Sequence, residues 1–167
     1  DNIHDYIERG FLDMGLMAEP IDIRKYDFIP MPIKEKWGVW IRTDSALAGK
    51  EWVQPEDLMK ERLIVATSDF MKSRIGQWMG NYMEQADIIA EGNLLYNEMM
   101  LAKSRLGVVL GIELDYTCEG LRFVPLYPTL ETSTVLAWKK EQVFTSVTST
   151  FLTFARQYEK VISNNKL

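Results

Sequence analysis

The chain has 167 residues, of which 47% are hydrophobic and 26% charged, a composition typical of a globular domain with a buried core. Its formal net charge of −5 at pH 7 argues against binding of nucleic acid by phosphate neutralisation. All apolar runs are shorter than the roughly 18 residues of a membrane helix, and no signal-peptide pattern opens the chain, so we expect a cytoplasmic protein without a membrane span.

The first half of the chain alternates between helical and extended patterns. Ile3, Tyr6 and Ile7 lie at helical spacing before Gly10, which suits the end of a helix. Residues 54–59 combine a proline with two acids, as the first turn of a short helix does. Apolar runs predict strands at residues 11–17, 28–33, 37–42 and 63–67, and the prolines place the second at a sheet edge or in a crossover.

The second half continues this alternation and ends in a long helix. One amphipathic helix passes through Ile75 and Met79, and another runs from Gly92–Asn93 to Gly107. Strands are predicted at residues 87–91, 108–112, 121–126 and 133–138. A closing helix over residues 143–162 carries one apolar stripe of Val147, Phe151, Phe154 and Tyr158. The alternation predicts an α/β protein with mainly parallel sheets.

The sequence offers little for catalysis, metal binding or a cofactor. One cysteine, Cys118, and one histidine, His4, are too few ligands for a typical zinc site. Cys118 is a candidate nucleophile, but its position in a polar loop, with His4 near the chain end, favours a structural interpretation. Glycine loops that hold phosphate and the glycine–serine elbow of hydrolases do not occur. We therefore expect neither an enzyme nor a bound cofactor.

Two groups of aromatic residues allow both a structural and a functional interpretation. The predicted helices carry side chains that could line an apolar pocket but more often form core: Trp78, Met79, Met83, Met99 and Met100. A strand over residues 37–42 would place Trp40 and Arg42 on one face and Val39 and Ile41 on the other. An aromatic ring beside a guanidinium can hold a small anion, or the solvated arginine can simply pack over the ring.

Several passages, taken in order, resemble one known family. They are residues 8–16 (ERGFLDMGL), 40–48 (WIRTDSALA), 55–65 (PEDLMKERLIV) and 101–112 (LAKSRLGVVLGI), followed by Leu126 and Trp138 before the closing helix. Their order and spacing are similar to those of the effector-binding domain of LysR-type transcription regulators. Ser45 and Ala46 replace a His-Pro pair of the family pattern, and the proline that ends the fourth passage is lacking.

The resemblance implies a periplasmic-binding-protein-like fold of type 2, in which crossover strands join two α/β lobes. Residues 1–42 and 121–167 would form part of lobe I, and residues 43–120 would form lobe II. In the family, a winged helix-turn-helix that binds DNA and the first strand, helix and second strand of lobe I come earlier in the chain. The resemblance therefore implies that the first part of lobe I is missing before residue 1.

The resemblance also implies an effector site between the lobes. Its counterparts lie at the end of the first crossover strand, after the first strand of lobe II, and at a strand-to-helix junction: Trp40, Arg42, Thr67, Ser68, Gly92, Asn93 and Leu94. Backbone N–H groups at a helix start favour an anion, and Asn93 can either cap the helix or donate to a ligand. We expect a small, anionic effector that contacts both Arg42 and the Gly92–Asn93 helix start.

The resemblance implies the effector-sensing domain of a bacterial regulator, which controls DNA binding by another domain. In the full-length protein the resemblance implies a homo-oligomer, paired through the helix at residues 75–83 and the strand at 87–91. These two elements would pack against the missing part of lobe I of a second subunit, so the apolar residues Trp78, Tyr82 and Ile88 would be uncovered here. Two alternatives share the fold: a solute-binding protein, and an enzyme such as a dehydratase.

The acidic charge and the lack of a recognition helix generate a first prediction. We expect these 167 residues to show no saturable, sequence-selective binding of duplex DNA. Fluorescence anisotropy titration of labelled duplexes at low salt, where phosphate contacts are strongest, measures this directly. Selective binding by the chain alone would contradict the assignment of DNA recognition to another domain.

Overall fold

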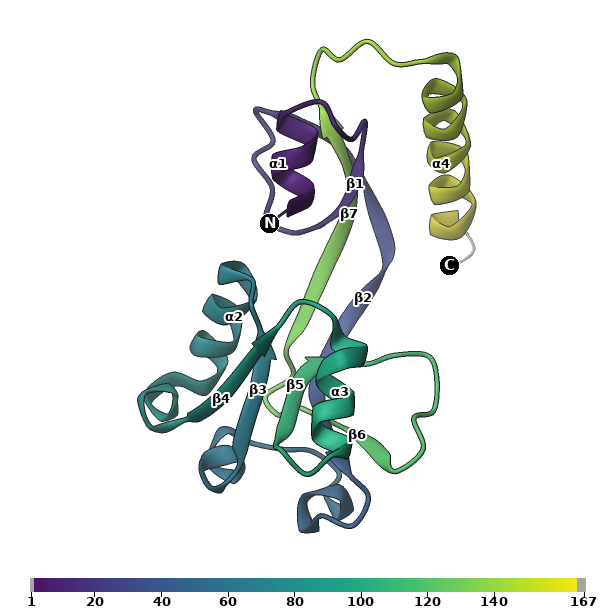
Figure 1. The fold of residues 1–167 in the computed structure, drawn as a ribbon. Helices are drawn as coiled ribbons and strands as arrows, with labels where there is room; N and C mark the ends of the chain where they lie inside the picture. The colour runs from purple at the N-terminus through teal and green to yellow at the C-terminus, as the bar shows by residue number, and fades with distance from the viewer. Residues whose placement is uncertain (1, 165–167) are drawn as a thin grey trace. The chain divides into compact units, whose positions relative to one another are not determined.

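The computed structural model describes residues 2–164, which form two compact units. Of the described residues, unit 1 comprises 2–35 and 132–164, and unit 2 comprises 36–131. Two strands, β2 (Tyr26–Arg42) and β7 (Glu131–Lys139), pass from one unit to the other (Figure 1). The units divide inside these strands, whereas the lobe boundaries expected at 42/43 and 120/121 lie elsewhere along the chain. The lobe assignment stays a prediction.

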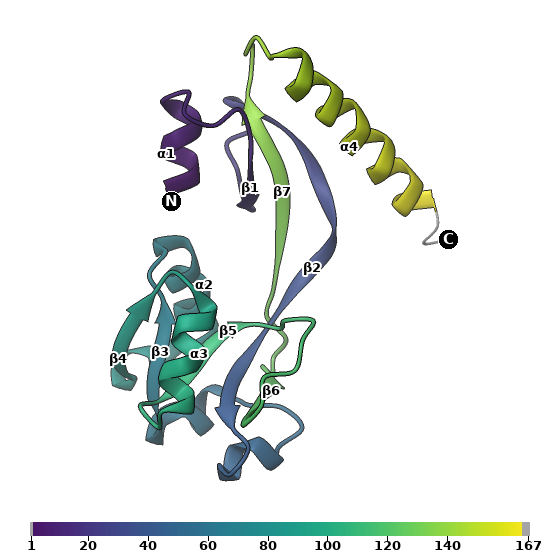
Figure 2. The same ribbon diagram turned by 45° about the vertical axis from the view of Figure 1, so that its right-hand side comes forward.

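Unit 1 places one helix on each face of a small sheet. Strand β1 (Gly15–Ala18) pairs antiparallel with β7, which neighbours β2. The alternating side chains of β7 point to opposite faces: Val135 and Ala137 pack with Ile7 of α1 (Asn2–Glu8), whereas Leu136 and Trp138 pack with Leu152 of α4 (Ser146–Asn164). Figure 2 shows α1 and α4 on opposite sides of these strands.

The apolar stripe predicted on the closing helix is present, but it faces away from this core. Val147 is 77% exposed and Phe154 is 61% exposed, and Phe151 and Tyr158 are also exposed. Leu152 and the partly buried Ala155 cover the sheet instead. Within the described residues, the most apolar face of α4 is therefore not the face that packs.

Unit 2 is a five-stranded sheet in the order β6-β2-β5-β3-β4. Its further strands are β3 (Arg62–Ala66), β4 (Asp87–Gly92), β5 (Val108–Ile112) and β6 (Leu121–Pro125). Strands β3, β4 and β5 run parallel, and β2 runs antiparallel to both β5 and β6. Short 3-10 helices occupy Ala46–Gly49, Pro55–Lys60 and Gly80–Gln85.

Two helices cover opposite faces of this sheet. Ile75 and Met79 of α2 (Asp69–Met79) pack against Leu63 and Val65, while Met99 of α3 (Leu95–Lys103) packs against Ile64. The strand alternation predicted for residues 37–42 is confirmed, since Val39 and Ile41 belong to the α2 side and Trp40 to the α3 side. Met79 and Met99 are fully buried and Trp78, Met83 and Met100 pack partly buried beside them, which confirms the core interpretation.

Several predicted elements differ from those observed. Mainly parallel sheets were expected, but among the described strands parallel ladders join only β3, β4 and β5, because strand and helix alternate regularly only between residues 62 and 112. Residues 28–33 and 37–42 belong to one continuous strand, since the fixed φ of proline is compatible with extended backbone. The strand expected at 11–17 begins at Gly15, and the short helix at 54–59 is a 3-10 helix.

The described helices do not include one that is both long and apolar enough to cross a membrane.

Close strand packing in unit 2 generates a prediction about stability. A Cβ atom on Gly38 of β2 would lie 2.5 Å from the Val124 carbonyl oxygen and 2.5 Å from Cε2 of Phe123. We expect Gly38→Ala to lower the free energy of unfolding by about 1–3 kcal/mol, because strand β6 must move away from β2 to make room for the added methyl group. Gly49→Ala is the control, since open space surrounds that position. Urea denaturation of both variants measures the difference, and equal stabilities would contradict the packing.

Candidate functional site

Two of the three predicted site segments meet at the carboxyl edge of the unit 2 sheet. Strands β3 and β4 are parallel neighbours, with Ala66 paired to Gly92 at their carboxyl ends. The ladder continues one residue further, since the N–H of Thr67 donates to the carbonyl oxygen of Gly92 at 2.7 Å. Thr67–Ser68 and Gly92–Leu94 therefore lie side by side, although 24 residues lie between Thr67 and Gly92 in the sequence.

Each of these segments leads directly into a helix whose start lacks a side-chain cap. Ser68 is the N-cap of α2 and Leu94 is the N-cap of α3, and neither makes a side-chain capping hydrogen bond. First-turn N–H groups without such partners carry partial positive charge and suit a negatively charged or strongly accepting ligand atom. Both helix starts therefore present donors at the edge where Thr67 and Gly92 meet.

The capping interpretation of Asn93 is wrong. Asn93 lies one residue before the N-cap Leu94, so it does not hold the helix start, and its side chain is exposed. Helix α3 is also shorter than expected, because it begins at Leu95 and ends at Lys103 rather than at Gly107. An exposed amide beside an uncapped helix start is free to contact a ligand.

Glu98 is a residue of this edge that the sequence analysis missed. It lies one turn into α3 and is 5% exposed. A Cβ atom on Gly92 would lie 2.7 Å from Cγ and 2.8 Å from Cδ of Glu98, so the side chain reaches back over the end of β4. The signal in the sequence is an acid on the buried stripe of a helix, three residues after Leu95 and four before Ala102.

Trp40, also predicted at the site, is a core residue. It is 3% exposed, and its indole N–H donates to the carbonyl oxygen of Ile112 at 2.9 Å. Phe123 packs against the ring with 5.3 Å between centroids, and the buried Cys118 belongs to the same cluster. In unit 2 the Trp40 ring therefore supports the sheet beneath α3.

Arg42 lies at the opposite edge of the unit 2 sheet. Strand β2 runs against β5, with Trp37 beside Ile112 and Trp40 beside Val109, so the chain reaches Arg42 next to the amino ends of β3 and β5. The expected arrangement, in which Arg42 and the Gly92–Asn93 helix start face one cleft, is therefore not the one observed. The reason is strand direction, which local sequence does not specify.

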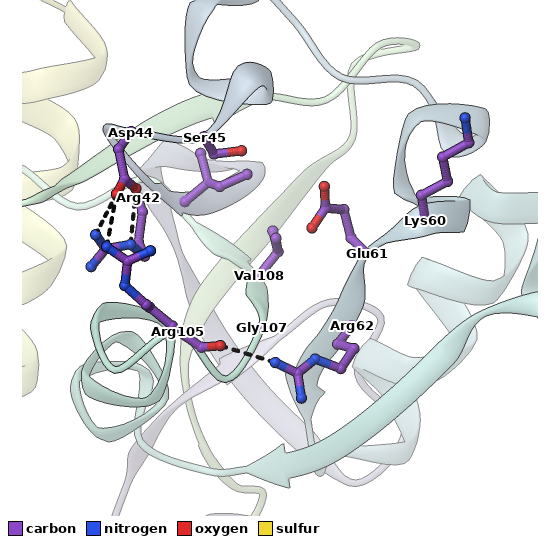
Figure 3. Close-up of a pocket in the computed structure, with 10 residues that line it drawn as sticks. Arg42, Asp44, Ser45, Lys60, Glu61, Arg62, Arg105, Gly107 and Val108 are labelled. Atoms are coloured by element: carbon purple, nitrogen blue, oxygen red, sulfur yellow. Dashed lines mark hydrogen bonds and ion pairs between the residues drawn. The ribbon is translucent and has the colours of Figure 1, made fainter.

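The Arg42 guanidinium is already occupied by groups of its own unit. It donates to the Asp44 carboxylate at 2.9 and 2.6 Å and to the carbonyl oxygen of Lys103 at 2.9 Å. The hydrogen bonds from Arg42 to the carboxylate are the main cause of the lowered pKa of Asp44. Arg105 reaches the same carboxylate at 3.2 Å, and Arg62 donates to the Arg105 carbonyl oxygen at 3.0 Å, as Figure 3 shows.

These groups line an open pocket of about 330 Å³ at the amino edge. Its charged side chains are Arg42, Asp44, Lys60, Glu61, Arg62 and Arg105. Figure 3 shows Arg42 and Arg105 converging on Asp44 rather than on the open space. Exposed ion pairs of this kind contribute little stability and need no ligand to explain them. An anion clamp made by Trp40 and Arg42 is not formed here, because the tryptophan ring is buried.

Comparison with known proteins identifies the family. The sequence matches the family described as LysR substrate binding domain over residues 1–160. No curated protein matches the sequence.

Solved structures with the same fold are distant in sequence. The effector binding domain of QuiR in complex with shikimate superposes with a TM-score of 0.80 at 16% identity, over 95% of this chain and 77% of that chain. The Synechocystis CcmR regulatory domain in complex with 2-PG gives 0.74 at 16%, over 95% and 79%.

A longer chain of the LysR family gives a similar result. The PA01 protein of Pseudomonas aeruginosa, a LysR family transcriptional regulator by its description, superposes with a TM-score of 0.75 at 15% identity, over 94% of this chain. The chain spans 57% of that protein's length. The observed α/β architecture agrees with the fold expected from the sequence, and with a match that covers nearly all residues the chain belongs to the LysR substrate binding domain family.

Proposed function

We propose that this chain is the effector-sensing domain of a bacterial LysR-type transcription regulator. It binds a small metabolite at the carboxyl edge of the unit 2 sheet, and another part of the full-length regulator binds DNA. QuiR and CcmR regulatory domains, whose fold this chain shares, are described in complex with shikimate and 2-PG. On this proposal the chain senses a ligand without catalysing a reaction, acts in the cytoplasm and works within a homo-oligomer.

One observation carries the placement: the hydrogen bond from Thr67 to Gly92 that joins the ends of β3 and β4. Beyond these ends the chain leaves the two strands toward opposite faces of the sheet, since α2 covers one face and α3 covers the other. In open α/β sheets a ligand binds outside the carboxyl ends of strands whose connections leave in opposite directions. Strands β3 and β4 meet this condition.

The chemistry of this edge suits a small carboxylate or another anion. Two uncapped helix starts offer backbone N–H groups, and Thr67 and Asn93 add exposed side chains that form hydrogen bonds. The proposed contacts are Thr67, Ser68, Gly92, Asn93 and Leu94. Trp40 and Arg42 are left out, since one is buried and the other lies at the amino edge.

Residues 43–120, which include this edge, correspond in the proposal to lobe II of the family.

For homo-oligomerisation, unit 2 offers a smaller apolar surface than expected. Trp78 donates its indole N–H to the Pro128 carbonyl oxygen and packs with Ile88 against the core of the unit, which leaves Tyr82 and Ile89 exposed.

Substitution at the two edges tests the placement. A thermal-shift screen of small carboxylates that includes shikimate is expected to yield at least one that raises the melting temperature. Thr67→Val and Asn93→Ala should each weaken its binding about tenfold, since a lost hydrogen bond to a charged ligand costs about 1–3 kcal/mol. Isothermal titration calorimetry measures the affinities.

Arg42→Gln is the control, because Arg42 binds Asp44 and Lys103 at the far edge. Its affinity should equal that of the parent chain. If only Arg42→Gln binds the ligand more weakly, the effector site lies at the amino edge instead. If no carboxylate in the screen raises the melting temperature, the proposal is contradicted.

A further inference from the structure

Helix α3 buries a carboxyl group for which the fold supplies no partner. Glu98 is 5% exposed, yet within residues 2–164 its side chain has no hydrogen bond or ion pair. Burial alone raises its pKa, and no charged neighbour contributes to the shift. A mostly buried carboxyl group without a protein partner must take its hydrogen bonds from solvent or from a ligand.

The Glu98 side chain points to the start of its own helix. In an α-helix each side chain leans toward the N-terminus, so a glutamate one turn in reaches back to the residues before the helix. The contact with Gly92 shows this direction, because any side chain on Gly92 would overlap Glu98. The carboxyl group therefore lies at the same edge as Thr67, Asn93 and the uncapped start of α3.

The carboxyl oxygens also remain in contact with solvent. In the part of the chain that the structure describes, Nε of Arg74 is the one fully inaccessible side-chain polar atom without a hydrogen bond. The Glu98 carboxyl oxygens also lack a hydrogen bond but do not belong to that class, so they keep some contact with solvent. Burial of the stem with access at the tip is the geometry of a group that contacts a ligand.

We propose that Glu98 determines effector specificity by accepting a hydrogen bond from a hydroxyl or ammonium group of a small carboxylate bound at the start of α3. The inference rests on the proposed function. The ligand's own carboxylate pairs with the uncapped N–H groups, and its donor group pairs with Glu98. The site then favours hydroxy or amino acids over acids that lack a donor.

A second acceptor at an anion site is consistent with electrostatics. Glu98 and the ligand carboxylate repel each other when both are ionised, but a donor between them satisfies both, and the positive end of the helix stabilises each. An acid without a donor leaves Glu98 unpaired and brings only the repulsion. A site that binds a polar group of its ligand strongly rejects analogues that lack this group, because the site's own polar residue is then left without a hydrogen-bond partner.

Matched acids test the inference on the full 167-residue chain. The probes are butanoate with its hydroxy and amino derivatives at carbons 2, 3 and 4, and benzoate with its three monohydroxy derivatives. The parent chain is expected to bind at least one donor-bearing acid about tenfold or more tightly than the matched acid without the donor. Calorimetric titration gives both dissociation constants.

Substitution of Glu98 then decides whether this residue causes the preference. Glu98→Met should bind the two matched acids equally, and Glu98→Gln, which retains an acceptor oxygen, should keep part of the preference. Glu84→Met is the control for charge, since Glu84 is an exposed acid of the same unit. A preference that persists in Glu98→Met, or its absence from the parent chain, overturns the inference.

The same titrations separate this inference from the proposed function. If Asn93→Ala weakens both matched acids while Glu98→Met leaves the preference intact, the edge is the effector site and only the role of Glu98 is wrong. If Asn93→Ala and Thr67→Val change neither affinity, the proposed placement itself fails. If none of the probes binds the parent chain, the assigned ligand class is wrong.

The pH dependence of stability tests whether Glu98 lacks a partner. Because its pKa is raised in the folded chain, its contribution to stability is fully present below the pKa of the unfolded chain and is lost as pH rises through the folded pKa. The melting-temperature difference between Glu98→Met and the parent chain should therefore grow in favour of Glu98→Met as pH rises from below the ordinary pKa of a glutamate through the raised pKa of the folded chain. A difference that stays constant or falls as pH rises would show that ionisation of Glu98 does not destabilise the folded chain, and it would overturn the inference.

Discussion

The parallel ladder between β3 and β4 is the constraint on which the candidate site depends. Its last hydrogen bond joins Thr67 to Gly92 and fixes where each strand ends. Since each strand passes at once into a helix, the same register sets the positions of both helix starts. A ladder displaced by one residue would turn every side chain of β4 to the other face of the sheet and separate the two loops.

The sequence predicted most strands and helices of unit 2 because their patterns are local. The apolar runs at 63–67 and 108–112 and the helical stripes between them belong to one regular alternation. The two loops that meet at the carboxyl edge were expected at the site because of the family resemblance. Such patterns depend on which residues are buried, which the residue types themselves largely decide.

Strand direction and order could not be predicted in the same way. Arg42 ends a predicted strand just as Thr67 does, and nothing nearby in the sequence shows that the strand of Arg42 runs in the opposite direction. Pairing of β2 with β5 involves residues about 70 positions apart, so it depends on the whole sheet. Asn93 has the residue type of a cap, yet the helix begins one residue later than its pattern suggests, within the usual uncertainty of helix ends.

Helix α3 has different chemistry at its two ends. Its first turn faces the carboxyl edge with unused donors, while its last residue, Lys103, accepts a hydrogen bond from Arg42 at the amino edge. The helix has nine residues, and the effect of a terminal charge falls off within about one turn. The closing contact at the far end therefore stabilises the helix independently of what binds at its start. Substitutions that alter ligand preference can accumulate at the first turn while the last turn keeps the helix in place.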